Sequence, residues 1–191
     1  MKKLISFAVA LILYVVGIKT TQAQIFDEGT KHFHVGIGFG SPYYYSGSKS
    51  TIPPIHISGE YGIKEKIGIG GLIGYTSSSY EDSYVYPGLY SYKYTWKFSY
   101  LIIGARGSYH FWQNDKADAY AGLLLGYNVA SVKEEYEGTG TGYYYDETPT
   151  VGGFALGAYG GIRYQFKENL GAFAELGYNI SWLSVGLHVK L

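Results

Sequence analysis

The chain has 191 residues with no Cys, 28 Gly, 23 Tyr and a single Met, and its 15 Lys and Arg balance 15 Asp and Glu. Without Cys it can form neither a disulfide framework nor a lipid-modified N-terminal Cys, and without a clustered basic face it is a poor candidate for binding nucleic acid. A composition so rich in Gly and Tyr disfavours helices and favours twisted strands.

The first 23 residues have the pattern of a secretory signal peptide. Two lysines supply a positive start, residues 4–17 form an apolar run too short to span a membrane as a helix, and Ala23 ends a small-residue cleavage site. We therefore expect the mature chain to begin at Gln24 and to form one domain over 24–191. Loss of the three lysines in residues 1–23 leaves twelve basic against fifteen acidic side chains, a net charge of −3.

Eight stretches then follow in which apolar side chains alternate with small or polar ones, the period of a β-strand. In chain order they are 31–40, 55–63, 67–75, 101–111, 121–129, 154–166, 170–178 and 183–191. One side of each stretch carries large apolar residues, and the other is mostly Gly, Ser and Ala. Small side chains suit a narrow, crowded barrel interior better than a water-facing surface. The predicted fold class is all-β, an eight-stranded antiparallel transmembrane β-barrel with an up-and-down meander.

Apart from Lys31 at the start of the first stretch, the charged residues within these stretches all fall on the small-residue side, away from lipid. They are Glu60, Arg106, Arg163, Glu175 and Lys190. The first four lie at comparable depths when the strands are laid in register, so two cations can neutralise two anions across the interior. We predict a structural ion-pair network in the lumen. A charge-lined path for ions or protons is the alternative interpretation.

The connections alternate between short and long, which is typical of barrels with short periplasmic turns and long external loops. The short ones are 64–66, 112–118 and 167–169, and the long ones are 41–51, 77–95 and 131–151. The long connections are rich in tyrosine, a rigid amphipathic residue that binding loops favour. The candidate binding tyrosines are Tyr43, Tyr44, Tyr45, Tyr84, Tyr86, Tyr90, Tyr143, Tyr144 and Tyr145.

Over residues 31–191 the pattern resembles the small eight-stranded outer-membrane barrels of the OmpA and OmpX type and related porin-like barrels with tyrosine-rich loops. Members of this family commonly end in an aromatic residue, and Leu191 stands at that place here. The resemblance implies residence in the outer membrane, in contact with lipid and lipopolysaccharide. Because the family includes structural proteins, adhesins and a few enzymes, it implies no single activity.

Two sets of residues suggest chemistry inside the barrel. His32 and His34 share the lumen side of the first strand, and His188 lies on the closing strand beside it. Three imidazoles could bind Zn, Cu or Ni, but polar filling of the lumen is the simpler interpretation. His56 and Ser58 share one face and are similar to the His-x-Ser of lipid A deacylase barrels, but they are predicted to face the lumen, where an acyl substrate has no access.

We therefore predict a protein without enzymatic activity, metal or other cofactor, with a structural or adhesin-like, surface-interaction role through its tyrosine-rich loops. The expected partner is a surface protein or a glycan. A narrow transport pore and a lipid A-modifying enzyme are the alternatives.

Overall fold

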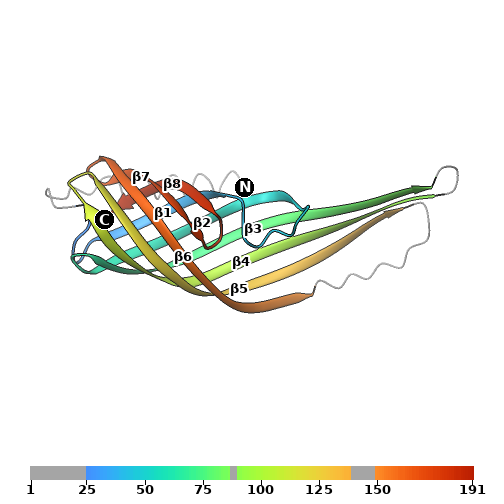
Figure 1. Ribbon diagram of the computed structural model, residues 1–191, viewed down its shortest axis with the longest axis horizontal. Coiled ribbons are helices and arrows are strands. Elements are labelled where there is room, and N and C mark those ends of the chain that lie inside the picture. Colours follow the sequence, from blue (N-terminus) through green and yellow to red (C-terminus); the bar gives the residue numbers. More distant parts are fainter. Residues whose placement is uncertain (1–24, 87–89, 139–148) are drawn as a thin grey trace.

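The computed structural model describes residues 25–86, 90–138 and 149–191, and within them the predicted barrel is confirmed. Its strands are β1 (Lys31–Phe39), β2 (Lys49–Lys64), β3 (Ile67–Tyr86), β4 (Tyr90–Gln113), β5 (Ala117–Gly138), β6 (Thr150–Lys167), β7 (Leu170–Tyr178) and β8 (Leu183–Lys190). Each pairs antiparallel with the next, and β8 pairs with β1, so the sheet closes (Figure 1). In the part of the chain described, no helix is long and apolar enough to cross a membrane.

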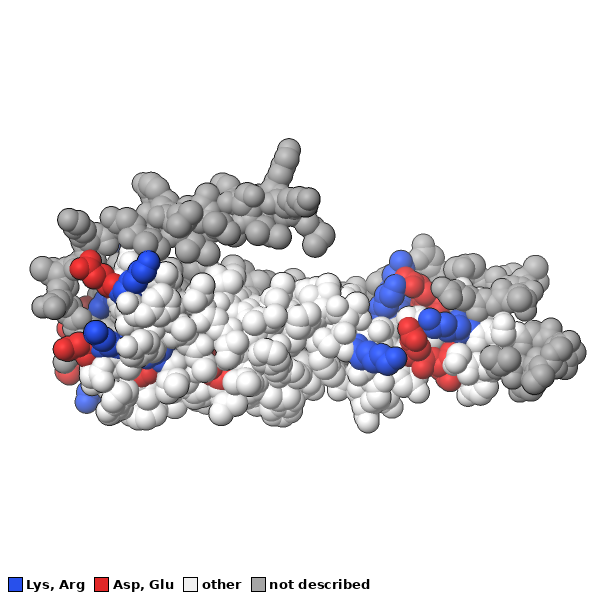
Figure 2. Space-filling view, turned by 90° about the horizontal axis from the view of Figure 1, so that it is seen from above, with Lys and Arg blue, Asp and Glu red and all other residues white. Residues whose placement is uncertain are grey.

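The two sides of the strands differ in burial as their residue types predict. In the Leu-Leu-Leu run of β5, Leu123 is 69% and Leu125 is 59% exposed, whereas Leu124 between them is 2% exposed. Phe154 and Leu156 of β6 point outward in the same way. In the view of Figure 2 the charged side chains gather toward the two ends of the molecule, with a largely uncharged band between them. An apolar belt of this kind is what a lipid bilayer requires.

Three strands continue far beyond the apolar belt. The predicted loop 77–95 is wrong for most of its length, because its residues extend β3 and β4 as a regular ladder from Ser77 opposite Ser99 to Tyr86 opposite Tyr90. The first residues of 131–151 likewise extend β5 along β4. Figure 1 shows these strands running out to one side of the barrel. We call residues 80–86, 90–96 and 132–138 the projection.

Side chains and two inserted segments fill the barrel. Near the projection, the turn between β7 and β8 places Ile180 in an apolar cluster. The other members of this cluster are Leu72, Ile102, Leu124 and Ala155, with Tyr43 packed against them. At the opposite end, where the short turns lie, Ile25 and Phe26 are fully buried. Layers of charged side chains lie between these two inserted segments.

Candidate functional sites

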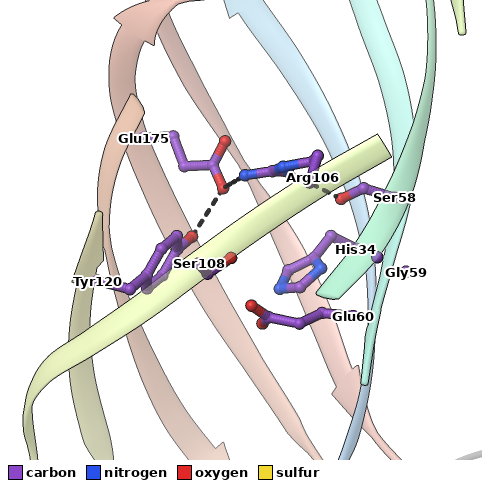
Figure 3. A pocket seen from close by; sticks show the side chains of 9 residues that line it. His34, Ser58, Gly59, Glu60, Arg106, Ser108, Tyr120 and Glu175 are labelled. Atoms are coloured by element: carbon purple, nitrogen blue, oxygen red, sulfur yellow. Dashed lines mark hydrogen bonds and ion pairs between the residues drawn. The ribbon is translucent and has the colours of Figure 1, made fainter. Parts of the chain in front are cut away.

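Two charged layers cross the lumen, and we call the one nearer the projection the upper layer and the other the lower layer. The upper layer is an ion pair between Arg106 of β4 and Glu175 of β7, which face one another across the lumen. Arg106 Nη2 is 2.7 Å from Glu175 Oε1, and the two side chains are 7% and 2% exposed. The Tyr120 hydroxyl donates to the same oxygen at 2.8 Å, and Arg106 Nη1 donates to Ser58 Oγ at 3.2 Å (Figure 3). The Arg106 guanidinium also lies 3.8 Å above the centre of the Tyr159 ring. Charge, hydrogen bonds and a ring face thus hold the pair across the barrel.

The lower charged layer is organised around Arg163 of β6. Its Nε and Nη2 atoms donate to the two oxygens of Asp118 at 2.9 and 2.8 Å, and Nη1 donates to Glu60 Oε2 at 2.7 Å. His110 lies between the same two carboxylates, with its Nδ1 toward Asp118 and its Nε2 3.2 Å from Glu60 Oε1. Gly68 makes room for this arrangement, since a Cβ there would overlap the Glu60 side chain.

The four charges singled out in the sequence therefore lie in the lumen as two separate pairs, Arg106 with Glu175 and Arg163 with Glu60. Asp118 and His110 complete the lower layer. Sequence reasoning missed Asp118 as a site residue because it was assigned to a turn, although it has the same parity as the inward-facing Tyr120. Removing any one of these partners would leave an uncompensated buried charge, which costs several kcal/mol.

A small cavity separates the two layers (Figure 3). It is lined by His34, Ser58, Gly59, Glu60, Gly70, Arg106, Ser108, Tyr120 and Glu175. Its polar lining and small size make it a gap in a packed interior rather than a ligand pocket.

The three histidines considered as weak metal ligands do come together near the end with the short turns. The ring centroid of His188 is 5.3 Å from that of His32 and 5.9 Å from that of His34. Among the described residues, however, no three His, Cys, Asp or Glu side chains are arranged to hold a metal ion. His56 and Ser58 form no catalytic pair, because both nitrogens of His56 lack a hydrogen-bond partner while Ser58 Oγ accepts from Arg106.

The inner face of the projection continues the lumen side of the strands and carries a chain of aromatic rings. Trp96 is central to it, with its ring centroid 5.7 Å from that of Tyr94 and 5.9 Å from that of Tyr80. Further contacts extend the chain to Tyr136, Tyr92, Tyr84 and Tyr45. We call these seven residues the aromatic face. Tyr45 and Tyr84 are 68% and 48% exposed.

The outer face of the projection is charged. Lys93 Nζ lies 3.4 Å from Glu81 Oε1, and Lys97, the residue of β4 that adjoins the projection, places its Nζ 2.6 Å from Glu135 Oε2. Lys133 approaches Glu135 as well, at 3.6 Å. The hydrogen bond from Lys97 lowers the pKa of the exposed Glu135 carboxyl. Alternation along the strands therefore gives the projection one ionic face and one aromatic face.

The predicted binding tyrosines have different surroundings. Tyr43 packs on the apolar cluster, and the Tyr44 hydroxyl is hydrogen-bonded to Thr76 Oγ1, so these two hold the first loop to the barrel. Tyr45 and Tyr84 belong to the aromatic face. Tyr86 and Tyr90 are opposite one another at the ends of β3 and β4, and 143–145 lie outside the described residues. Trp96 was not predicted, although it shares the parity of the nearby tyrosines Tyr92 and Tyr94.

No protein-family model and no curated protein sequence matches the chain. Solved structures do match it. The N-terminal β-barrel domain of Pseudomonas aeruginosa OprF aligns over 86% of this chain and 99% of its own, with a TM-score of 0.53 and 11% identity. The P. aeruginosa outer-membrane protein OprG aligns over 87% of this chain and 97% of its own, with a TM-score of 0.51 and 10% identity. The chain thus has the fold of the small eight-stranded outer-membrane β-barrels.

Proposed function

We propose that the protein resides in the outer membrane and binds a surface protein or a glycan through the aromatic face. The observation that carries this proposal is the aromatic face itself, six rings on one side of a sheet that extends beyond the apolar belt, with Tyr45 of the loop between β1 and β2 against them. A cluster of exposed and half-buried aromatic rings outside the apolar belt is a candidate contact surface. Lipid and lipopolysaccharide surround the barrel, and the signal peptide predicted over 1–23 would direct its export.

The residues of the aromatic face suit binding more than structural support alone. Tyr and Trp bury a large area with few rotatable bonds, so they lose little entropy on contact, and their hydroxyl and indole groups still donate hydrogen bonds. Asp82 lies opposite Tyr94 and Glu134 lies opposite Trp96, so two carboxylates flank the rings. Sugar hydroxyls or peptide amides can donate to these carboxylates while apolar ligand surface covers the rings.

The binding test replaces Tyr94 and Trp96 together by Ser and measures capture of partners from cell-surface extracts and on a glycan array. We expect the double variant to lose at least about 2 kcal/mol of binding free energy, about thirty-fold in Kd, because aromatic residues dominate contact surfaces. The matched control replaces Lys93 and Lys97, on the opposite face of the same strand, by Ser. Equal binding by the two double variants would refute a role for the aromatic face.

A pore function predicts steady ion conduction, which the filled lumen opposes. An eight-stranded barrel is only wide enough for its own side chains, and here apolar and charged layers cross it in succession. In planar bilayers we expect little or no conductance from the unmodified protein. Rare small openings should become more frequent in Arg106→Ala or Glu175→Ala, which break the upper layer. Steady, ion-selective currents in the unmodified protein would instead favour the pore.

A lipid A-modifying enzyme is the remaining alternative. Its candidate residues His56 and Ser58 are each 4% exposed and belong to the lumen side of β2. We expect the lipid A mass spectrum to be unchanged when the gene is deleted. Gain or loss of an acyl chain in the deletion strain would support the enzyme.

A further inference from the structure

The segment before β1 is inserted into the mouth of the barrel at the end with the short turns. Ile25 and Phe26 are fully buried, and the Ile25 carbonyl accepts a hydrogen bond from His32 Nε2 at 3.0 Å. Backbone hydrogen bonds of 2.8 Å join Gly62 of β2 to Gly29 and Thr30. We call residues 25–30 the N-terminal plug. Its deepest contact is a stacked pair in which the Phe26 ring lies 3.6 Å from the His110 ring, centroid to centroid, at an interplanar angle of 12°.

The surroundings of His110 define its charge. Its Nδ1 faces Asp118 Oδ2, and its Nε2 faces Glu60 Oε1. An ionised carboxylate has no proton to donate, so both ring nitrogens must be the donors, and a ring with two N–H groups is an imidazolium. The charge balance of the two layers agrees with this assignment. Three buried carboxylates face two guanidiniums, and an imidazolium supplies the third positive charge.

Each element packed around His110 contributes to this environment. The groups in contact with its ring are Glu60 of β2, Asp118 and Tyr120 of β5, and Arg163 of β6. On β1, His34 contacts Arg163 and His32 stacks on the other neighbour of His110, Phe26. Arg163 Nη2 lies 3.1 Å from His110 Nδ1, but both also reach Asp118 Oδ2, so the two cations share one anion. In the turn between β2 and β3, Lys66 O accepts a hydrogen bond from the backbone N–H of His110 at 2.9 Å.

We propose that His110 is a buried imidazolium and that its charge holds the N-terminal plug in the mouth of the barrel. A cation under an aromatic face is attracted by the ring's electrons, which favours the Phe26 stack. When the ring loses a proton, one nitrogen lone pair points at a carboxylate oxygen, the layer gains a net negative charge, and Phe26 loses the nearer of its two cations, leaving the Arg163 guanidinium carbon 5.7 Å from the ring centre. The plug is therefore docked while His110 carries both protons and is released as rising pH removes one.

The protonation state is measured directly on the unmodified protein, with ¹⁵N-labelled histidine in nanodiscs. We expect both His110 ring nitrogens to carry protons at neutral pH and their two resonances to lie close together, as in an imidazolium. Widely separated ring resonances, with one nitrogen unprotonated, would overturn the assignment.

Release of the plug is measured by a spin label on Glu28→Cys, an exposed position in a chain that has no other cysteine. We expect an immobile label at neutral pH and a step to a mobile one as His110 deprotonates. A label on Glu65→Cys, in the exposed turn between β2 and β3, should show no step. A label on Glu28→Cys that stays immobile while the ¹⁵N spectrum shows His110 losing a proton would overturn the proposal that the charge on His110 holds the N-terminal plug.

Two variants assign the step to its residue. His110→Gln should leave the Glu28→Cys label mobile at every pH. His188→Gln should keep the change from an immobile to a mobile label, because His188 is a buried histidine whose ring contacts are with His32 and His34. Loss of the step in both variants, or in neither, would contradict the proposal. If His110→Gln does not fold, the ¹⁵N spectrum and the label titration of the protein with its native His110 still decide it.

Discussion

Arg163→Met is expected to destabilise the folded barrel by about 3 to 5 kcal/mol, the cost of leaving a buried charge without its partner. Methionine keeps the unbranched apolar stem but has no donor, so Asp118 would lose two hydrogen bonds and Glu60 would lose one. Urea unfolding of the refolded protein in detergent micelles measures the change. Migration of unboiled samples in SDS gels gives a second readout, since a closed barrel stays compact until it is boiled.

The control for Arg163→Met is Lys97→Met, which breaks an ion pair whose side chains are 41% and 39% exposed. It should cost no more than about 1 kcal/mol, because water screens an exposed pair. Changing Glu60 to Gln in the Arg163→Met background should restore part of the lost stability, since one carboxylate fewer is left without a cation while Asp118 keeps its contact with His110 Nδ1. Equal losses from Arg163→Met and Lys97→Met would show that the lower layer is not charged as described.

The membrane-embedded part of the fold was predictable from the sequence because lipid and a narrow lumen impose opposite demands on alternate residues. The outward side must be apolar, and the inward side must be small wherever a large side chain reaches across. Gly161 illustrates the second demand, since a Cβ there would overlap Tyr120 and Glu175. These demands leave a regular pattern, and the strand predicted over 170–178 has the observed bounds of β7.

The projection was not predictable in the same way because neither of its faces touches lipid. Residues 77–95 alternate tyrosine with serine, lysine and acidic residues, and no apolar side identifies them as strand. They form one because Tyr84 pairs with Tyr92 and Tyr80 with Trp96 across the hairpin. Cross-strand pairs of this kind stabilise a sheet only once the register is set.

The lower layer was partly hidden for a related reason. Its members come from β2, β4, β5 and β6, so their contacts depend on how far each strand is shifted along its neighbour. The predicted network contained Arg163 and Glu60 but not Asp118 or His110. The N-terminal plug carried no periodic signal, because Ile25 and Phe26 fill the mouth from a segment outside any strand.

Leu123→Arg is expected to impair assembly by about 2 to 4 kcal/mol, the cost of a cation on the lipid face near the middle of the bilayer. Leu123 is 69% exposed and lies in the middle part of the apolar belt. Toward one rim the outward-facing Tyr127 follows it on β5, and toward the other rim the outward-facing Tyr164 of β6 is paired with Ala117. Backbone pairing with Gly107 and Ala158 is unaffected by the substitution, so any loss arises from lipid contact. Refolding yield into vesicles, followed by unfolding in urea, measures it.

Asn128→Arg, five residues further along β5, provides the matched control. Asn128 faces inward near the outer rim and is opposite Gly153, where a Cβ would meet nothing within 4 Å, so there is space beside it. We expect it to change stability by no more than about 1 kcal/mol, because an inward side chain near the rim does not enter lipid. If both variants assembled equally well, the assigned facing of β5 would be wrong. A loss confined to Leu123→Arg would place the boundary between lipid and lumen along this strand.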